Sequence, residues 1–246
     1  MYSTKYIKPN STSEALEAIK SMGEGKFLAG GMTLIPTLKQ RLASPDGLVD
    51  ISGCDLDSIS DEGDAIKIGA MTKHASVAES GLVNKAIPAL AKLADGIGDR
   101  QVRNRGTLGG SVANNDPSAC YPSAVLALMA IVYTNTRSIE ANEFFTGMFE
   151  TALEENEIIE AISFSKPTKA NYVKFPNPAS RYAMVGVFVA KFASGVRVAV
   201  TGAGEDGVFR AIDIEAALSA NFDSASLDGM TMSENGLMLD IHASPA

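Results

Sequence analysis

The sequence has few of the residues that bind metals or form disulfide bonds. Its 246 residues include two cysteines, Cys54 and Cys120, and two histidines, His74 and His242. An iron–sulfur cluster held by four thiolates is therefore excluded for this chain alone. The histidines stand apart from carboxylate or cysteine partners at metal-ligand spacing. We expect no metal site, and we interpret each cysteine as a small buried hydrophobic residue.

Long hydrophobic runs and an excess of positive charge are also missing. The longest apolar stretches, Ala124–Tyr133 and Tyr182–Ala190, are about half of the ~20 residues that span a bilayer. A net charge of −8 argues against a surface that neutralises nucleic-acid phosphates. No basic, apolar and small-residue leader opens the chain. We therefore expect a cytoplasmic protein with no transmembrane segment and no nucleic-acid partner.

Side-chain arrangements typical of nucleophilic or acid–base enzymes are absent as well. No Ser-His-Asp, Cys-His or paired-carboxylate pattern is apparent in the sequence. Any redox chemistry would therefore depend on a bound organic cofactor.

The first of two glycine pairs lies in Ala29-Gly30-Gly31-Met32-Thr33. Two successive residues without Cβ allow positive φ and a close approach of the backbone to a bulky anion. The apolar stretch Lys26–Ala29 precedes the pair, and leucines at helical spacing begin at Leu34. Thr33 is a candidate N-cap, and Pro36 falls in the first turn of the expected helix. The order strand, glycine loop, helix would direct free amides at a phosphate.

The second glycine pair lies further along the chain, in Thr107-Leu108-Gly109-Gly110-Ser111. Its surroundings, Ile97–Pro117, are small, polar and glycine-rich, which is typical of a site rather than a core. We expect many free backbone amides here, so that the two loops hold one diphosphate from both sides. For Arg100, Arg103 and Arg105 we favour a solvated, ion-paired turn over direct phosphate contact.

Several of these segments resemble one known family. The strings Gly98–Gly110, Ala29–Pro36 and Leu48–Ile51 are similar to the FAD-binding medium subunit of molybdenum hydroxylases. The similarity is greatest to the aerobic carbon monoxide dehydrogenase type, with xanthine dehydrogenase FAD domains as more distant relatives. It continues in the expected order over nearly the whole chain, through Asp116-Pro117, Tyr121-Pro122, Phe144–Gly147, Glu157–Ile159 and Pro178–Arg181.

The resemblance implies an α+β fold of the vanillyl-alcohol-oxidase/PCMH type. It places two FAD-binding subdomains at 1–55 and 56–165, and a small C-terminal flavoprotein domain with an antiparallel sheet at 171–246. The family continues into another helix, so we expect this third domain to be incomplete. FAD would lie between the two glycine loops, which would wrap its diphosphate and riboses. Tyr182 matches a position where some relatives place an aromatic ring against the isoalloxazine; the alternative is a strand-end tyrosine packed on the core.

Two positions depart from the family pattern. Met32 stands where relatives often carry histidine, and Cys120 stands where many carry aspartate. The first change removes a polar contact to the cofactor but leaves the glycine amides, and the second removes a hydrogen-bond acceptor. We expect altered cofactor affinity and flavin potential, with binding retained.

The resemblance also implies a function. The chain would be an electron-transfer subunit of an oxidoreductase, passing electrons from the [2Fe-2S] centres of a small partner chain through FAD to a terminal acceptor. A large molybdopterin-binding subunit would oxidise the substrate, and the assembly would be a dimer of heterotrimers. Two alternatives remain open: a self-contained FAD oxidoreductase with its own acid or base, and a scaffold subunit that has lost FAD.

A third glycine motif, Gly202–Gly207, fits the G-x-G-x-x-G pattern of Rossmann folds. A strand with alternating valines precedes it, but the strand-like segment Val208–Ile214 follows where a helix would be required. Glu205 and Asp206 would also repel a diphosphate. We interpret this motif as a β-hairpin turn.

The remaining patterns predict secondary structure and one linker. Ser11 and Glu14 form a capping-box signal for a first helix. The other predicted features are strands at Leu48–Ile51, Ala65–Ala70, Ile131–Thr134 and Ile158–Phe164, helices around Ile87–Ala94, from Tyr121 onward and at Glu215–Ala220, and a linker at Ser165–Ala170.

Overall fold

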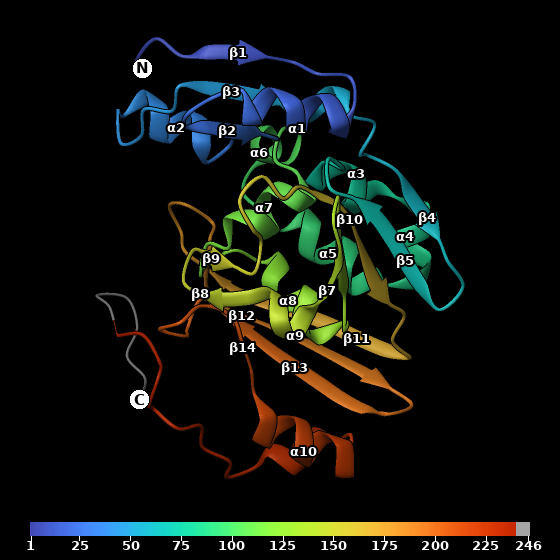
Figure 1. Cartoon of the computed structure of the whole chain (residues 1–246). Helices are drawn as coiled ribbons and strands as arrows, with labels where there is room; N and C mark the ends of the chain where they lie inside the picture. Colours follow the sequence, from blue (N-terminus) through green and yellow to red (C-terminus); the bar gives the residue numbers. More distant parts are fainter. Residues whose placement is uncertain (240–246) are drawn as a thin grey trace.

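The computed structural model describes residues 1–239, which fold around three main β-sheets stacked along the molecule (Figure 1). The first sheet, at the top of Figure 1, is parallel and has the strand order β1-β3-β2. We refer to this sheet and its connections as the first lobe. Its elements are β1 (Lys5–Ile7), α1 (Thr12–Lys20), β2 (Gly25–Leu28), α2 (Leu34–Lys39), β3 (Gly47–Asp50) and the 3-10 helix η1 (Ile51–Gly53).

The predicted start of α1 is confirmed. The Ser11 hydroxyl accepts a hydrogen bond from the Glu14 amide (3.2 Å), and the Glu14 carboxylate accepts one from the Asn10 amide (2.8 Å). These bonds satisfy backbone donors at the helix N-terminus and fix the direction in which the chain enters the helix. Ala15 and Ile19 then pack into the core of the first lobe.

The second sheet is antiparallel and has the order β4-β5-β10-β6-β7. We refer to this sheet and its helices as the second lobe. Its strands are β4 (Ile59–Asp61), β5 (Ala65–Gly69), β6 (Ile131–Thr134), β7 (Ser138–Glu140) and β10 (Ile159–Ser165), with a separate hairpin of β8 (Phe145–Gly147) and β9 (Glu150–Thr151). Its helices are α3 (His74–Glu79), α4 (Gly81–Ala86), α5 (Pro88–Asp95), α6 (Arg100–Arg103), α7 (Leu108–Asn114), α8 (Tyr121–Ala127) and α9 (Ala141–Phe144).

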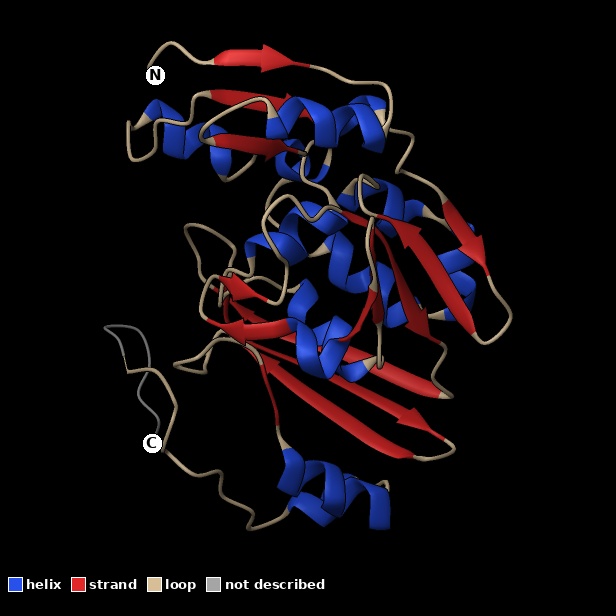
Figure 2. Cartoon of the chain, in the orientation of Figure 1, coloured by secondary structure: helices blue, strands red, loops and turns tan. Residues whose placement is uncertain are grey.

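The third sheet, near the bottom of Figure 1, is antiparallel with the order β11-β12-β13-β14. Helices pack on both of its faces, with α8 on the inner face and α10 on the outer one (Figure 2). Tyr172 and Phe188 of this sheet belong to the same buried core as the second lobe, which joins the two regions. The elements are β11 (Lys169–Pro176), β12 (Ala183–Phe192), β13 (Gly195–Thr201), β14 (Phe209–Arg210), α10 (Ile212–Ala220) and the 3-10 helix η2 (Ser224–Leu227).

The predicted linker at Ser165–Ala170 is wrong at both of its ends and shorter than expected. Ser165 ends β10 and β11 begins at Lys169, so Lys166–Thr168 are the residues between the strands. The Thr168 amide donates to the Lys191 carbonyl, which ties even this short connection to the sheet. Proline and polar residues favour a turn, but here the turn is tight and structured.

The hairpin prediction at Gly202–Gly207 is confirmed, since Val200 pairs with Phe209 and Ala199 with Arg210 across β13 and β14. The strand predicted to continue to Ile214 is wrong, because α10 begins at Ile212. The Glu215 carboxylate accepts hydrogen bonds from the Val198 amide and the Arg210 side chain. These tertiary bonds stabilise a helix that begins at Ile212. The alternation of Ile212 and Ile214 with Asp213 is typical of a strand and does not indicate this start. The end of the predicted third domain, with His242, lies outside the described residues.

Candidate functional site

A cavity of about 580 Å³ is lined by residues from both lobes and from the segment that precedes β12. Leu108, the first residue of α7, does not line it, because its side chain is completely buried in the core of the second lobe. The other residues expected to bind the cofactor all line this one cavity: Ala29, Gly30, Gly31, Met32, Thr33, Thr107, Gly109, Gly110, Ser111 and Tyr182. The structure therefore brings together segments that are far apart in the sequence.

The first glycine segment leaves its backbone donors free. Gly31 adopts a φ of +73°, the left-handed region that glycine enters without strain. Within residues 1–239, the amides of Gly30–Leu34 have no hydrogen-bond acceptor, whereas the Ile35 amide donates to the Gly31 carbonyl (3.0 Å). Thr33 makes no side-chain cap. This differs from its expected role as a hydroxyl cap, and it leaves the donors at the start of α2 available to a ligand.

The second glycine segment differs from the expectation of free amides. The Leu108 amide donates to the Thr72 carbonyl (2.9 Å), the Gly109 amide to the Ala70 carbonyl (2.8 Å), and the Gly110 amide to Thr107 Oγ1 (3.2 Å). The amides of this segment are used in hydrogen bonds that begin α7 and that join it to the turn after β5. The segment therefore shapes the cavity, while the first segment supplies the backbone donors.

Each glycine of the two pairs makes room for a specific neighbour. A Cβ on Gly109 would lie 2.5 Å from Ala70 Cβ, and one on Gly110 would lie 2.8 Å from Thr107 Oγ1. A Cβ on Gly30 would meet backbone, with Gly106 Cα at 2.8 Å and the Arg105 carbonyl oxygen closer still. The lobes thus touch backbone to backbone beside the cavity, and this close approach requires glycine at position 30.

Of Arg100, Arg103 and Arg105, Arg103 forms the ion-paired turn that the sequence favours, and the other two have no ion pair within residues 1–239. Arg103 Nη1 donates to the carbonyls of Ile97 (3.1 Å) and Gly98 (3.2 Å), and its Nε lies 3.6 Å from the Asp95 carboxylate. These bonds close the turn between α5 and α6. Arg103 is therefore committed to protein contacts.

Tyr182 lies at the cavity with 44% of its surface exposed. The alternative of a tyrosine packed on the core is therefore wrong. Burial of part of the ring raises the pKa of Tyr182, the Asp116 carboxylate raises it further, and the Thr33 hydroxyl opposes the rise. Tyr182 thus faces residues of both lobes.

Cys120 and its neighbours form a polar corner of the cavity. Lys174 Nζ lies 3.6 Å from Cys120 Sγ and donates to the carbonyls of Gly96 (2.5 Å) and Arg181 (3.0 Å). The buried Tyr172 hydroxyl has no hydrogen-bond partner within residues 1–239. Its pKa is raised by burial and by the neighbouring Cys120. An ammonium group and an unused hydroxyl therefore surround a thiol, which is a poor acceptor.

The variant Cys120→Asp is expected to bind FAD about tenfold more tightly, because a carboxylate there would pair with Lys174 and offer the cofactor a charge-assisted acceptor. Fluorescence titration of the cofactor-free protein measures the affinity. Cys54→Asp is the matched control, since Cys54 is similarly buried but belongs to the core of the first lobe and does not line the cavity. Unchanged or weaker binding by Cys120→Asp would contradict this account of the polar corner.

His74 also lines the cavity, although in the sequence it is only an isolated histidine with no assigned role. It is 4% exposed, its Nδ1 has no hydrogen-bond partner within the described residues, and its ring centroid lies 5.4 Å from that of Tyr121. Burial lowers the pKa of His74 to about 4, and the Arg103 charge adds to this. The imidazole is therefore neutral at pH 7. Its neighbours in the sequence, which include Lys73 and Ser76, do not indicate that it is buried.

The burial of neutral His74 predicts that the folded protein loses stability in acid. The pKa of His74 falls from 6.5 in the unfolded chain to about 4 in the fold, so protonation favours unfolding. The contribution of the neutral His74 to stability is fully present above pH 6.5. About 3 kcal/mol of the free energy of unfolding is expected to be lost as the pH falls to 4. Denaturant unfolding of the wild type and of His74→Gln at a series of pH values measures this loss. The variant is expected to lack most of the decline, and parallel curves would contradict the assignment.

Two features are absent from residues 1–239. No group of three or more His, Cys, Asp or Glu side chains is arranged to hold a metal ion. No helix in this part of the chain is both long and apolar enough to cross a membrane.

The fold and the site define a two-lobed protein with a glycine segment whose backbone amides are free at the cavity between its lobes. Residues 2–167 match the family model described as the FAD binding domain in molybdopterin dehydrogenase. The chain belongs to this family. It is the FAD-binding medium subunit of a molybdenum hydroxylase, and the family and cofactor expected from the sequence are confirmed.

Individual relatives support this assignment. The chain is 36% identical over 211 residues to the carbon monoxide dehydrogenase medium chain of Hydrogenophaga pseudoflava, which covers 80% of this chain and 74% of the relative. It is 33% identical over 210 residues to the nicotine 6-hydroxylase medium subunit of Paenarthrobacter nicotinovorans, covering 81% and 74%. The structure of quinoline 2-oxidoreductase from Pseudomonas putida 86 matches with a TM-score of 0.87 and 27% identity, over 99% of this chain and 90% of that one.

Proposed function

We propose that FAD binds in the 580 Å³ cavity, with its pyrophosphate on the free amides of Gly30–Leu34. These unpaired donors, beside a glycine at positive φ, are the single observation that carries the proposal. The residues present fit an anionic dinucleotide. The free amides belong to residues that line the cavity, and the lack of a side chain at Gly110 leaves space between the two glycine segments. When bound, FAD supplies a redox centre that accepts single electrons and delivers one or two.

The chain's own residues then have distinct roles. The first glycine segment, Ala29–Thr33, would bind the pyrophosphate through its backbone. The second, Thr107–Ser111, would contribute the wall formed by Gly109 and Gly110 and the hydroxyls of its two ends. Tyr182 would pack against the flavin ring, because it is the aromatic side chain exposed at this end of the cavity.

We further propose that this subunit receives electrons from the [2Fe-2S] centres of a small partner chain and passes them to a terminal acceptor. A large molybdopterin-binding chain would oxidise the substrate, in a dimer of heterotrimers. The relatives' names specify carbon monoxide and nicotine, so medium chains of one family serve different substrates. This supports a substrate pocket on the large chain. Two buried free cysteines suit a reducing cytoplasm.

Purification of the complex tests this function. The expected result is a large molybdopterin chain and a small iron–sulfur chain recovered with this one, and a yellow protein with about one FAD per chain. A colourless protein that does not take up added FAD would favour the scaffold alternative. Reduction of the flavin by substrate in the isolated chain would favour a self-contained enzyme.

A further inference from the structure

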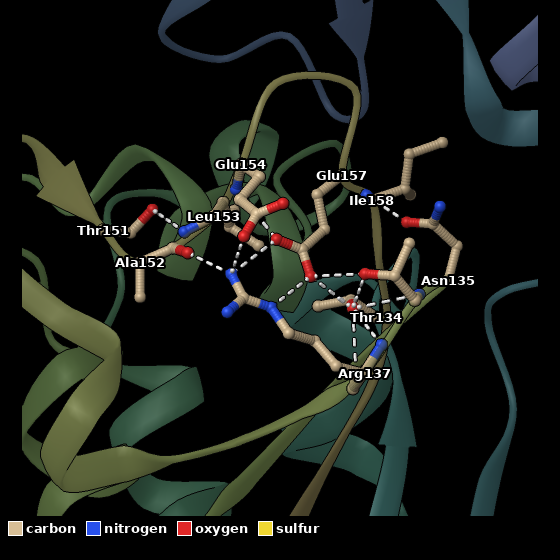
Figure 3. A network of polar contacts seen from close by, with 10 residues as sticks. Thr134, Asn135, Arg137, Thr151, Ala152, Leu153, Glu154, Glu157 and Ile158 are labelled. Atoms are coloured by element: carbon tan, nitrogen blue, oxygen red, sulfur yellow. Dashed lines mark hydrogen bonds and ion pairs between the residues drawn. The ribbon is translucent and has the colours of Figure 1, made fainter.

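A buried carboxylate beside the cavity holds an unusually complete set of hydrogen bonds (Figure 3). Glu157 Oε1 accepts from Thr134 Oγ1 (2.6 Å), Thr136 Oγ1 (2.9 Å) and Arg137 Nε (3.0 Å). Glu157 Oε2 accepts from Arg137 Nη2 (3.0 Å) and the Glu154 amide (2.8 Å). The Glu157 side chain is 2% exposed. The bond from Arg137 is the largest cause that lowers the pKa of Glu157, to about 2.

This network fixes the connection between β9 and β10 at both of its ends. Arg137 Nη2 also donates to the Ala152 carbonyl (2.6 Å), where the connection begins. At its far end, the Ile158 amide donates to Asn135 Oδ1 (2.7 Å), and the Asn135 amide donates to the Ile158 carbonyl (3.1 Å). Figure 3 shows these groups converging on the turn between β6 and β7. The connection is therefore bound at both ends to the turn between β6 and β7 of the second lobe.

The same connection reaches the first lobe. Ile158 is 4% exposed and packs with Ala15, Ile19, Val49 and Ile51, which form the core beneath the parallel sheet. Its neighbour Ile159 belongs instead to the core of the second lobe. Leu153, Glu157 and Ile158 also line the cavity. One segment thus spans both lobes along the cavity wall, and Glu157 lies next to the residue that crosses.

We propose that the Glu157–Arg137 network sets the separation of the two lobes, and with it the fit of the cavity around FAD. This inference rests on the proposed function. The free amides of Gly30–Leu34 belong to the first lobe and the Gly109–Gly110 wall to the second, so their spacing depends on how firmly Ile158 is held. Glu157 and Arg137 are positioning residues, which act through the connection.

The chain contains a matched control far from the cavity lining. Glu215 has a side chain 7% exposed, and its Oε1 accepts from Arg210 Nε (3.0 Å) and from the Val198 amide (2.9 Å). It is therefore a second buried glutamate paired with arginine and with a backbone amide. Neither Glu215 nor Arg210 lines the cofactor cavity. Any loss of stability from neutralising a buried glutamate is common to both sites, whereas lobe separation depends on Glu157.

The experiment compares Glu157→Gln with Glu215→Gln in the full chain. Both are expected to lower the unfolding temperature. Glu157→Gln alone is expected to raise the FAD dissociation constant, by about tenfold or more, and to change the fluorescence of bound flavin. Arg137→Lys keeps the charge without the two-pronged geometry, and is expected to give a smaller change in the same direction. If Glu157→Gln does not fold, Arg137→Lys takes its place in the comparison with Glu215→Gln. Equal FAD affinities in Glu157→Gln and Glu215→Gln would overturn the proposal.

Hydrogen exchange of the cofactor-free proteins separates this inference from the proposed function. Glu157→Gln is expected to speed amide exchange both in residues 152–158 and at the hydrogen-bonded amides of Ile35 and Thr37 across the cavity, and Glu215→Gln in neither. If the wild type fails to bind FAD but this coupled exchange appears, the proposed function falls while the positioning role stands. Faster exchange confined to residues 152–158 would overturn the positioning role, whatever the FAD result.

Discussion

The variant Gly110→Val is expected to lose FAD, to less than about a tenth of the wild-type occupancy, while remaining folded. A Cβ at this position would lie 2.8 Å from Thr107 Oγ1 and 3.4 Å from Ala29 Cβ, so a branched side chain would occupy the gap between the two glycine segments. The cost to the fold is limited to the Thr107 cap of α7, about 1 kcal/mol. Flavin absorbance per chain measures the occupancy, and circular dichroism the folding.

Gly81→Val provides the control for that substitution. Gly81 begins α4, and no atom lies within 4 Å of the position that its Cβ would take. The same side chain is therefore added without a steric conflict. If Gly110→Val retained as much flavin as Gly81→Val, the cavity between the glycine segments would not be the cofactor site.

The variant Gly30→Ala is expected to damage both stability and cofactor binding. Its Cβ would meet the Arg105 carbonyl oxygen and Gly106 Cα, which are backbone atoms that cannot rotate away. The two lobes would have to separate at this backbone contact. We expect a loss of about 3 kcal/mol, which lowers the unfolding temperature by roughly 6 to 12 °C. Differential scanning calorimetry of the cofactor-free protein measures this shift.

Gly81→Ala is again the comparison, because it adds the same methyl group in open space. An unfolding temperature for Gly30→Ala close to that of Gly81→Ala would show that the backbone contact between the lobes does not constrain the fold. Weaker FAD binding without any loss of stability would instead restrict the effect to the cavity.

Local features of the fold could be predicted from the sequence. Ser11 and Glu14 define a helix start through neighbours on the chain, and the hairpin at Gly202–Gly207 follows from the strands on either side of it. The free amides after Ala29 were predictable for the same reason, since the strand, the glycines and the helix are consecutive. Such signals depend on residues a few positions apart, which sequence patterns record.

Features set by distant partners could not be predicted. Gly109 looks like part of a second loop with free amides, but its amide donates to the carbonyl of Ala70, a distant residue in the turn after β5. Glu157 belongs to a motif that resembles the family, yet its role depends on Arg137 and Thr134, which the fold brings next to it. His74 is neutral because the fold buries it, and the residues next to it in the sequence do not indicate that burial.

A crystal structure of the chain with FAD tests the central claim most directly. The account predicts the pyrophosphate on the main-chain nitrogens of Gly30–Leu34, with the flavin ring beside Tyr182. A dinucleotide bound elsewhere, with these nitrogens still facing solvent, would contradict it.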